Sequence, residues 1–223
     1  MAVLTKLRVF LQLQRGLLFR YGWLRARWVG KPVNRNGDPL PWITYPAIDL
    51  LSQFDFADAS VFAWGSGFST LWWAKRCKSI TTVESGPNWI PYIRPMLPAS
   101  VKFLTPAFTE TEEVRALYDE DRMYDVIVID NNGPFRAACA DAAVGKIAVG
   151  GMILLDNSDQ CLKTCSVLRG SGFTQIDFTG FVPGNGYAHC TSVFFKNTLK
   201  FSVSGGSQPH RSPAQPNPPW DGC

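Results

Sequence analysis

The most constraining feature of the sequence is a nearly continuous apolar run, YDVIVID, at Tyr124 to Asp130. Runs of this kind are typical of strands buried on both faces, as the strands of a parallel sheet are. The run therefore predicts a sheet with other parts of the chain packed on each side of it.

Shorter segments around this run alternate between strand and helix patterns. Further strands are expected at 60–63, 79–84, 101–104, 152–155, 174–178 and 192–196. Helices are expected at 46–53, 69–75, 87–97, 135–149 and 160–169, with Gly150 and Gly151 ending the fourth. This alternation predicts an α/β fold with a doubly wound, mostly parallel seven-stranded sheet.

Composition divides the chain into three parts. Residues 43–200 are expected to form one domain with one core, which is an ordinary size for a single domain. Residues 1–42 hold a basic amphipathic helix over 3–24 and a linker over 30–42 that is rich in Gly, Pro and Asn. Residues 201–223 are dominated by Gly, Ser, Pro, Gln and Asn, so we expect a disordered tail.

The N-terminal helix is basic, and the sequence does not decide which surface it contacts. The cations Lys6, Arg8, Arg15, Arg20, Arg25, Arg27 and Lys31 all precede the first acid, Asp38. Such a helix can pack on its own domain, dock a protein partner or lie on an anionic membrane. Nucleic-acid binding is not expected, because no basic face interleaved with aromatic residues accompanies the charge.

The cellular location is predicted from cysteines and hydropathy. The six cysteines show no paired C-x-x-C spacing, and no apolar run approaches the roughly 18 to 20 residues that span a bilayer. We expect a reduced cytoplasmic protein, with peripheral membrane contact through residues 1–30 left open.

A glycine bend after the first expected strand predicts the ligand site. Gly65, Ser66 and Gly67 follow that strand, and Glu84 lies 19 residues beyond Gly65, after the second strand. Such glycines let the backbone approach a ligand, and such an acid is placed to bind ribose hydroxyls. Thr70 stands where a dinucleotide fingerprint has a third small residue. A nucleoside ligand without a diphosphate is therefore favoured, and an NAD-dependent oxidoreductase is disfavoured.

The segments VFAWGSGFST, TTVES, YDVIVID and GGMILLDNSD, in this order, resemble the class I S-adenosylmethionine-dependent methyltransferases. The flanks PWITYPAIDLL and GFTQIDFTGFVPG are most similar to a bacterial group of that family. The resemblance implies S-adenosylmethionine as cofactor, with its methionine part at Gly65, Ser66 and Gly67 and its ribose at Glu84. Ser69, Thr70 and Asp130 complete the expected cofactor contacts. Ala63 stands where the family usually has an acid.

A second resemblance is to the catechol O-methyltransferase branch of the family. It implies a divalent cation such as Mg²⁺ held by Asp130, Asp156 and Asn157, since oxygen ligands suit a hard cation. The alternative is that these residues only cap turns. The lysine that this branch uses in catalysis is replaced by Gly133.

The expected activity is O-methylation of a small molecule or a sugar hydroxyl. Asp130 is the main catalytic candidate and Arg136 the second. Arg136 is expected to bind an acidic substrate or to cap the site, and the alternative is a plain surface or salt-bridge arginine. His189 is a further possible base, whereas Trp72 and Trp73 are expected to pack their helix on the sheet. The alternative function is a binding or scaffold protein of the same fold without turnover.

Overall fold

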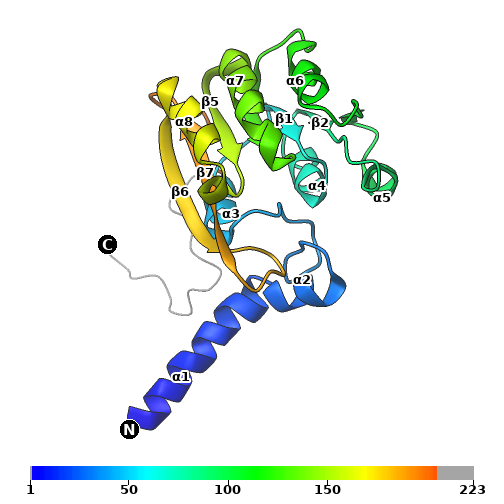
Figure 1. Ribbon diagram of the computed structural model, residues 1–223. Helices are drawn as coiled ribbons and strands as arrows, with labels where there is room; N and C mark the ends of the chain where they lie inside the picture. Colours follow the sequence, from blue (N-terminus) through cyan, green and yellow to red (C-terminus); the bar gives the residue numbers. More distant parts are fainter. Residues whose placement is uncertain (1, 205–223) are drawn as a thin grey trace.

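The computed structural model describes residues 2–204 of the chain, and a seven-stranded sheet forms its centre (Figure 1). The strands are β1 (Ser60–Trp64), β2 (Ser79–Val83), β3 (Val101–Leu104), β4 (Tyr124–Ile129), β5 (Ile147–Leu155), β6 (Thr174–Phe181) and β7 (Ala188–Phe195). Their order across the sheet is β3-β2-β1-β4-β5-β7-β6. The first five strands are parallel, and β7 runs antiparallel to both β5 and β6. The predicted doubly wound, mostly parallel sheet is confirmed.

Helices cover both faces of the sheet. In β1, Val61 and Ala63 belong to one apolar cluster, whereas Phe62 and Trp64 belong to another. The first cluster includes α3 (Tyr45–Leu51) and α4 (Phe68–Ala74), and the second includes α6 (Glu110–Tyr118), α7 (Arg136–Lys146) and α8 (Leu162–Gly170). From Val126 to Ile129, the side chains of β4 also alternate between the two clusters. Because they are buried on both faces of the sheet, β4 is apolar along almost its whole length.

The predicted helix over 135–149 is wrong at its end. The helix α7 stops at Lys146, and β5 already begins at Ile147. Gly150 has a φ of +74°, and the pairing of β4 with β5 shifts register beside it. A Cβ at Gly151 would lie 2.6 Å from the carbonyl oxygen of Asp125. The two glycines therefore permit an irregularity within a strand, and they do not end a helix.

The helix α6 was not predicted, although its start carries a recognisable signal. The Thr109 hydroxyl accepts a hydrogen bond from the Glu112 amide at 3.3 Å, as an N-cap residue does. Leu117 is the fully buried apolar residue of this helix. The remaining short helices near the sheet are α5 (Ile90–Ile93), η2 (Arg94–Met96), η3 (Gly133–Phe135) and η4 (Ser158–Gln160).

The basic helix expected over 3–24 is divided into three pieces. These are α1 (Ala2–Gln14), a π-helical segment η1 (Arg15–Arg20) and α2 (Trp23–Val29), with Gly22 at a φ of +84° before α2. Figure 1 shows α1 projecting away from the sheet and its helices. Of the three options for the basic helix, packing on its own domain therefore does not apply to α1. Within residues 2–204, no helix is long and apolar enough to span a bilayer.

The start of the expected C-terminal tail is ordered against the domain. Val203 forms a bridge with Phe54, and the Asp55 amide donates to the Ser202 carbonyl oxygen at 2.9 Å. The Phe201 ring packs on Phe56 with the ring centroids 4.9 Å apart. Residues 201–204 thus add to the core, because Phe201 brings an aromatic side chain to bury. The rest of the predicted tail, 205–223, lies outside the described residues.

Candidate functional site

The glycine bend between β1 and α4 passes very close to the end of β4. Gly65 has a φ of +92°, and a Cβ there would lie 2.5 Å from the carbonyl oxygen of Asp130. Both the left-handed backbone and the close approach require glycine at this position. The residues after β1 and after β4 therefore meet at one edge of the sheet, where the carboxyl ends of parallel strands face a ligand.

Glu84 extends from the end of β2 to the same bend. One carboxylate oxygen accepts a hydrogen bond from the Ser66 amide at 3.2 Å, and the other accepts one from the Gly86 amide at 2.8 Å. Burial raises the pKa of Glu84, although these amide hydrogen bonds oppose the change. The acid and the glycine bend thus converge, as the nineteen-residue spacing predicts.

A pocket of about 640 Å³ opens at this edge of the sheet. Its volume lies within the range of small-molecule and cofactor sites. The predicted residues that line it are Gly65, Ser66, Gly67, Ser69, Glu84 and Asp130. Thr70 is instead buried, and its hydroxyl accepts a hydrogen bond from the Gly67 amide at 3.1 Å. The structure therefore places Thr70 in support of the bend and not on the pocket wall.

Aromatic side chains that the sequence did not single out line the same pocket. They are Trp42, Phe68, Trp89 and Tyr92. The ring centroids of Trp89 and Tyr92 lie 4.7 Å apart, and the Trp89 indole N–H donates to the Ser66 carbonyl oxygen at 2.6 Å. The only local signal for Trp89 is its position five residues after Glu84. Trp72 and Trp73 are fully buried in the core, which confirms their predicted packing role.

Asp130 is the second acid of the pocket, and its environment holds back its ionisation. Its side chain is 30% exposed, and one oxygen lies 3.0 Å from the Arg136 guanidinium. Burial and, second, the charge of Asp156 raise the pKa of Asp130 to about 7, while Arg136 acts in the opposite direction. A carboxyl with such a pKa can accept a proton near neutral pH.

Arg136 is used within the protein. Besides Asp130, its guanidinium donates to the Asn131 carbonyl oxygen at 2.8 Å and to the Asp156 carbonyl oxygen. The side chain is buried, and it does not belong to the pocket lining. Of the predicted roles, the structure describes the salt bridge, and the contacts of Arg136 join the segments that follow β4 and β5.

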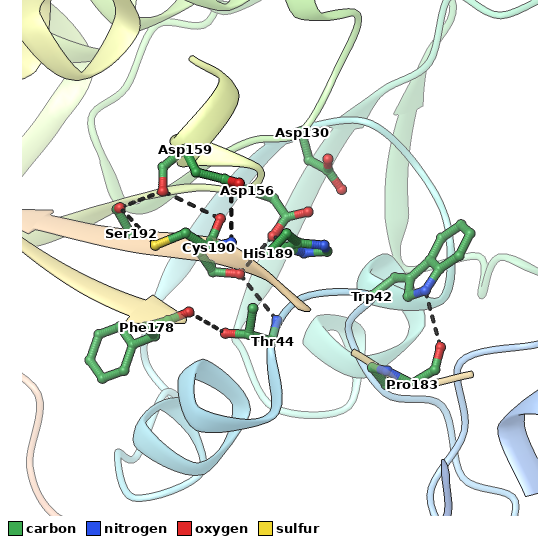
Figure 2. A network of polar contacts seen from close by, with 12 residues as sticks. Trp42, Thr44, Asp130, Asp156, Asp159, Phe178, Pro183, His189, Cys190 and Ser192 are labelled. Carbon is green, nitrogen blue, oxygen red and sulfur yellow. Dashed lines mark hydrogen bonds and ion pairs between the residues drawn. The ribbon is translucent and has the colours of Figure 1, made fainter. Parts of the chain in front are cut away.

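A buried polar network lies beside Asp130, as Figure 2 shows. The Thr191 hydroxyl donates to the Asp156 carboxylate at 2.6 Å, and the His189 Nε2 lies 3.3 Å from the same oxygen. Burial alone would lower the pKa of His189, but Asp156 outweighs it and the pKa is raised. Among the described residues, neither ring nitrogen of His189 has a hydrogen-bond partner of good geometry.

His189 reaches this network because β7 runs antiparallel to its neighbours. Leu155 at the end of β5 pairs with Ser192, so the first residues of β7 lie beyond the carboxyl end of β5. A final antiparallel strand thus brings its beginning, and not its end, to the ligand edge. The antiparallel pairing of β7 with β5 therefore brings His189 next to Asp156, which the histidine alone does not indicate in the sequence.

Two of the three predicted cation ligands, Asp130 and Asp156, are engaged by protein partners. Asp130 is paired with Arg136, and Asp156 is held by Thr191 and His189. Asn157 follows with a left-handed φ of +48° and lies immediately before η4. Within residues 2–204, no group of three or more His, Cys, Asp and Glu side chains is arranged to hold a metal ion. A guanidinium beside Asp130 competes with a cation for the same carboxylate, so this donor set does not suit Mg²⁺ well.

Comparison with solved structures identifies the fold. An O-methyltransferase from Bacillus cereus, in complex with S-adenosylhomocysteine (SAH), matches with a TM-score of 0.59 at 15% identity, over 83% of this chain and 96% of that one. Precorrin-6y C5,15-methyltransferase from Geobacter metallireducens GS-15 matches with a TM-score of 0.53 at 18% identity, over 68% and 87%. An rRNA methylase from Streptococcus thermophilus gives 0.53 at 12% identity, over 72% and 100%. No protein-family model and no curated protein matches the sequence.

The chain therefore has the class I S-adenosylmethionine-dependent methyltransferase fold. Its strand order and antiparallel β7 are those of this fold, and its distant structural matches include O-methyltransferases. At these identities the likeness concerns the fold alone, and the chemistry has to be argued from the site.

Proposed function

We propose that this protein is an S-adenosylmethionine-dependent methyltransferase that acts on a hydroxyl of a small molecule or a sugar. The observation that carries the proposal is the convergence of Gly65 and Glu84 on one pocket of about 640 Å³. A glycine bend and a strand-end acid on the same wall suit a nucleoside whose ribose hydroxyls donate to the acid.

The pocket wall suggests how the cofactor lies. The Glu84 carboxylate would receive the ribose hydroxyls, and the exposed faces of Trp89 and Tyr92 would pack against the adenine. The methionine part would then lie along Gly65, Ser66 and Gly67. Ala63 is buried in β1 and offers no carboxylate for the ammonium group. Asp130 and Glu84 are the acids of the described pocket lining, so with Glu84 at the ribose the ammonium would donate to Asp130, to water or to a backbone carbonyl oxygen of the bend.

Asp130 is proposed as the general base. The acceptor oxygen would form a bond to the methyl carbon while the bond from that carbon to sulfur breaks. When bound, S-adenosylmethionine would supply the methyl group and leave as the neutral thioether, while the Asp130 carboxylate would accept the acceptor's proton. A pKa of about 7 suits this transfer, because the ionised form is populated near neutral pH and still takes up a proton readily. Arg136 would act as a positioning residue that orients Asp130.

The divalent cation remains a prediction, and no step of the proposed reaction uses it. If Mg²⁺ were bound, it would lower the pKa of the acceptor hydroxyl. In its place, the Arg136 guanidinium supplies fixed positive charge beside Asp130. Chelation is therefore expected to leave cofactor binding intact.

Calorimetric titration with SAH tests the cofactor, and transfer of labelled methyl from S-adenosylmethionine to a lysate fraction tests turnover. We expect micromolar binding, and labelling that is lost in Asp130→Asn. No binding at high micromolar concentration would contradict the proposal. A rate unchanged in Asp130→Asn while SAH affinity falls would assign this acid to the cofactor ammonium and not to catalysis.

The alternative is a cofactor-binding protein without turnover, and the observation that favours it is the missing acid at Ala63. It predicts that SAH and S-adenosylmethionine bind while no acceptor is labelled. Methyl transfer that depends on Asp130 would exclude it.

A further inference from the structure

The N-terminal arm, defined as residues 4–31, carries an unusual amount of exposed apolar surface. In α1, side chains that would be buried in a packed helix are 44–72% exposed, and Trp28 in α2 is 88% exposed. The large apolar residues exposed in the arm are Leu4, Leu7, Val9, Phe10, Leu11, Leu13, Phe19, Leu24, Trp28 and Val29. Extended apolar surface of this kind marks a site of contact with a partner or a membrane.

All of the charge in the arm has one sign. Lys6, Arg8, Arg15, Arg20, Arg25, Arg27 and Lys31 are its charged residues, and no acid occurs before Asp38. The apolar surface is therefore surrounded by seven positive charges. A partner for this surface must combine a hydrophobic layer with negative charge.

The distribution of residues around α1 suits a flat, amphipathic partner. At 100° per residue, Thr5, Arg8 and Gln12 fall within one narrow sector of the helix, while Leu4, Leu7 and Leu11 lie together on another side. Lys6 lies between Phe10 and Leu13 in a further apolar stretch of the helix surface, where a long basic side chain can reach headgroups while its stem stays in apolar surroundings. This arrangement is typical of helices that lie in the interface of a bilayer.

We infer that the N-terminal arm binds the surface of an anionic lipid bilayer. A second copy of the chain is a poorer occupant, because it would bring seven further positive charges against the first seven and would supply no acid from its own arm. An anionic bilayer meets both requirements, since its headgroups pair with the cations and its acyl boundary receives the apolar side chains.

The arm also adjoins the pocket. Ala26 and Arg27 in α2, together with Gly30 and Lys31 after it, line the pocket that holds Gly65 and Glu84. Binding of the arm to a bilayer would thus bring the rim of the pocket to the lipid headgroups. This step concerns the position of the site and does not depend on the reaction that the site performs.

Vesicle flotation of the full chain tests the inference. The probes are phosphatidylcholine vesicles with and without phosphatidylglycerol, in low and high salt. We expect binding only when phosphatidylglycerol is present, and release by salt, because the headgroup attraction is screened. Equal binding to both vesicles, or no binding to either, would overturn the inference.

Paired variants separate the arm from the net charge of the protein. Lys6→Gln/Arg8→Gln should weaken binding about 30-fold, taking roughly 1 kcal/mol for each basic residue near an anionic surface. The control Lys75→Gln/Lys163→Gln removes the same charge from exposed positions of the domain and should leave binding unchanged. Equal weakening in both pairs would refute a role for the arm.

A third variant tests the apolar side of α1 and the competing occupant. Leu7→Gln/Phe10→Gln should abolish vesicle binding while the thermal unfolding of the domain is retained, since both side chains are more than half exposed. Light scattering in the absence of lipid should give the same mass for this variant and for the wild type. A wild-type dimer that this variant disrupts would show that a second copy covers the arm, and would overturn the inference.

Discussion

Replacement of Glu84 by Gln gives the sharpest test of the proposed cofactor site. The change keeps the size of the side chain and removes its charge. In the structure both carboxylate oxygens already accept an amide hydrogen bond, from Ser66 and from Gly86, which fixes the carboxylate against the bend. The remaining lone pairs are those that the ribose hydroxyls would use.

The expected magnitude follows from this count of hydrogen bonds. The side-chain amide of the Glu84→Gln variant has one acceptor oxygen for two backbone amides, so its NH₂ group must face the N–H of either Ser66 or Gly86. A hydrogen bond to a charged group contributes about 1.5–3 kcal/mol, so losing one such bond to the ribose corresponds to roughly 10- to 150-fold weaker SAH binding. The unpaired amide should also lower the free energy of unfolding by about 1–3 kcal/mol.

Calorimetry and urea unfolding measure the two effects separately. The control is Glu110→Gln, which removes the same charge from an exposed position in α6 outside the pocket lining. SAH affinity should fall in Glu84→Gln and remain unchanged in Glu110→Gln. If Glu84→Gln bound SAH within about threefold of the wild type, the carboxylate would not hold the ribose and the reasoning would be refuted.

Four further predictions concern the bend, the polar network and the cation. Gly65→Ala should lower the free energy of unfolding by more than about 2 kcal/mol in urea, whereas Gly67→Ala, whose added Cβ meets no atom within 4 Å, should cost less; equal costs would contradict the role of the bend. Carbon-13 NMR should show the Asp130 carboxyl titrating near pH 7, and a pKa near 4 would remove the proposed base. The folded-state pKa of His189 is raised, so the stability contributed by its ion pair with Asp156 should be lost as pH rises through that pKa. Urea unfolding should show this loss in the wild type and a smaller loss in His189→Gln. Identical pH profiles of the two proteins would exclude a stabilising ion pair. Calorimetry in EDTA should give the same SAH affinity as in Mg²⁺, and a requirement for Mg²⁺ would restore the predicted cation.

Much of the fold could be predicted because strand and bend signals are local. The β-branched and apolar segments that form β1 to β4 need no information beyond their own residues, and the bend at Gly65 follows directly from its glycine. The error at β5 has a physical cause. A glycine pair is compatible with both a helix end and a strand irregularity, and only the neighbouring Asp125 carbonyl, 2.6 Å from the Cβ position of Gly151, distinguishes the two.

The site could be predicted only in part, because its residues come from distant parts of the chain. Glu84 and Asp130 follow predicted strands, so their place at the ligand edge could be expected from the sheet topology alone. The role of Arg136 could not, since a helical arginine near an acid can face solvent or a partner with equal ease. Its burial against the Asp156 carbonyl depends on how α7 packs against the end of β5.

Residue type and spacing were enough to predict that a glycine bend and an acid would follow two neighbouring parallel strands, because both features depend on local backbone geometry. Only the packed chain shows that Trp89 and Tyr92 form a wall of the same pocket and that His189 meets Asp156. The same packing leaves the apolar side chains of α1 exposed. These outcomes depend on which elements pack together and which find no partner, and contacts between distant segments are not encoded in any single stretch of residues.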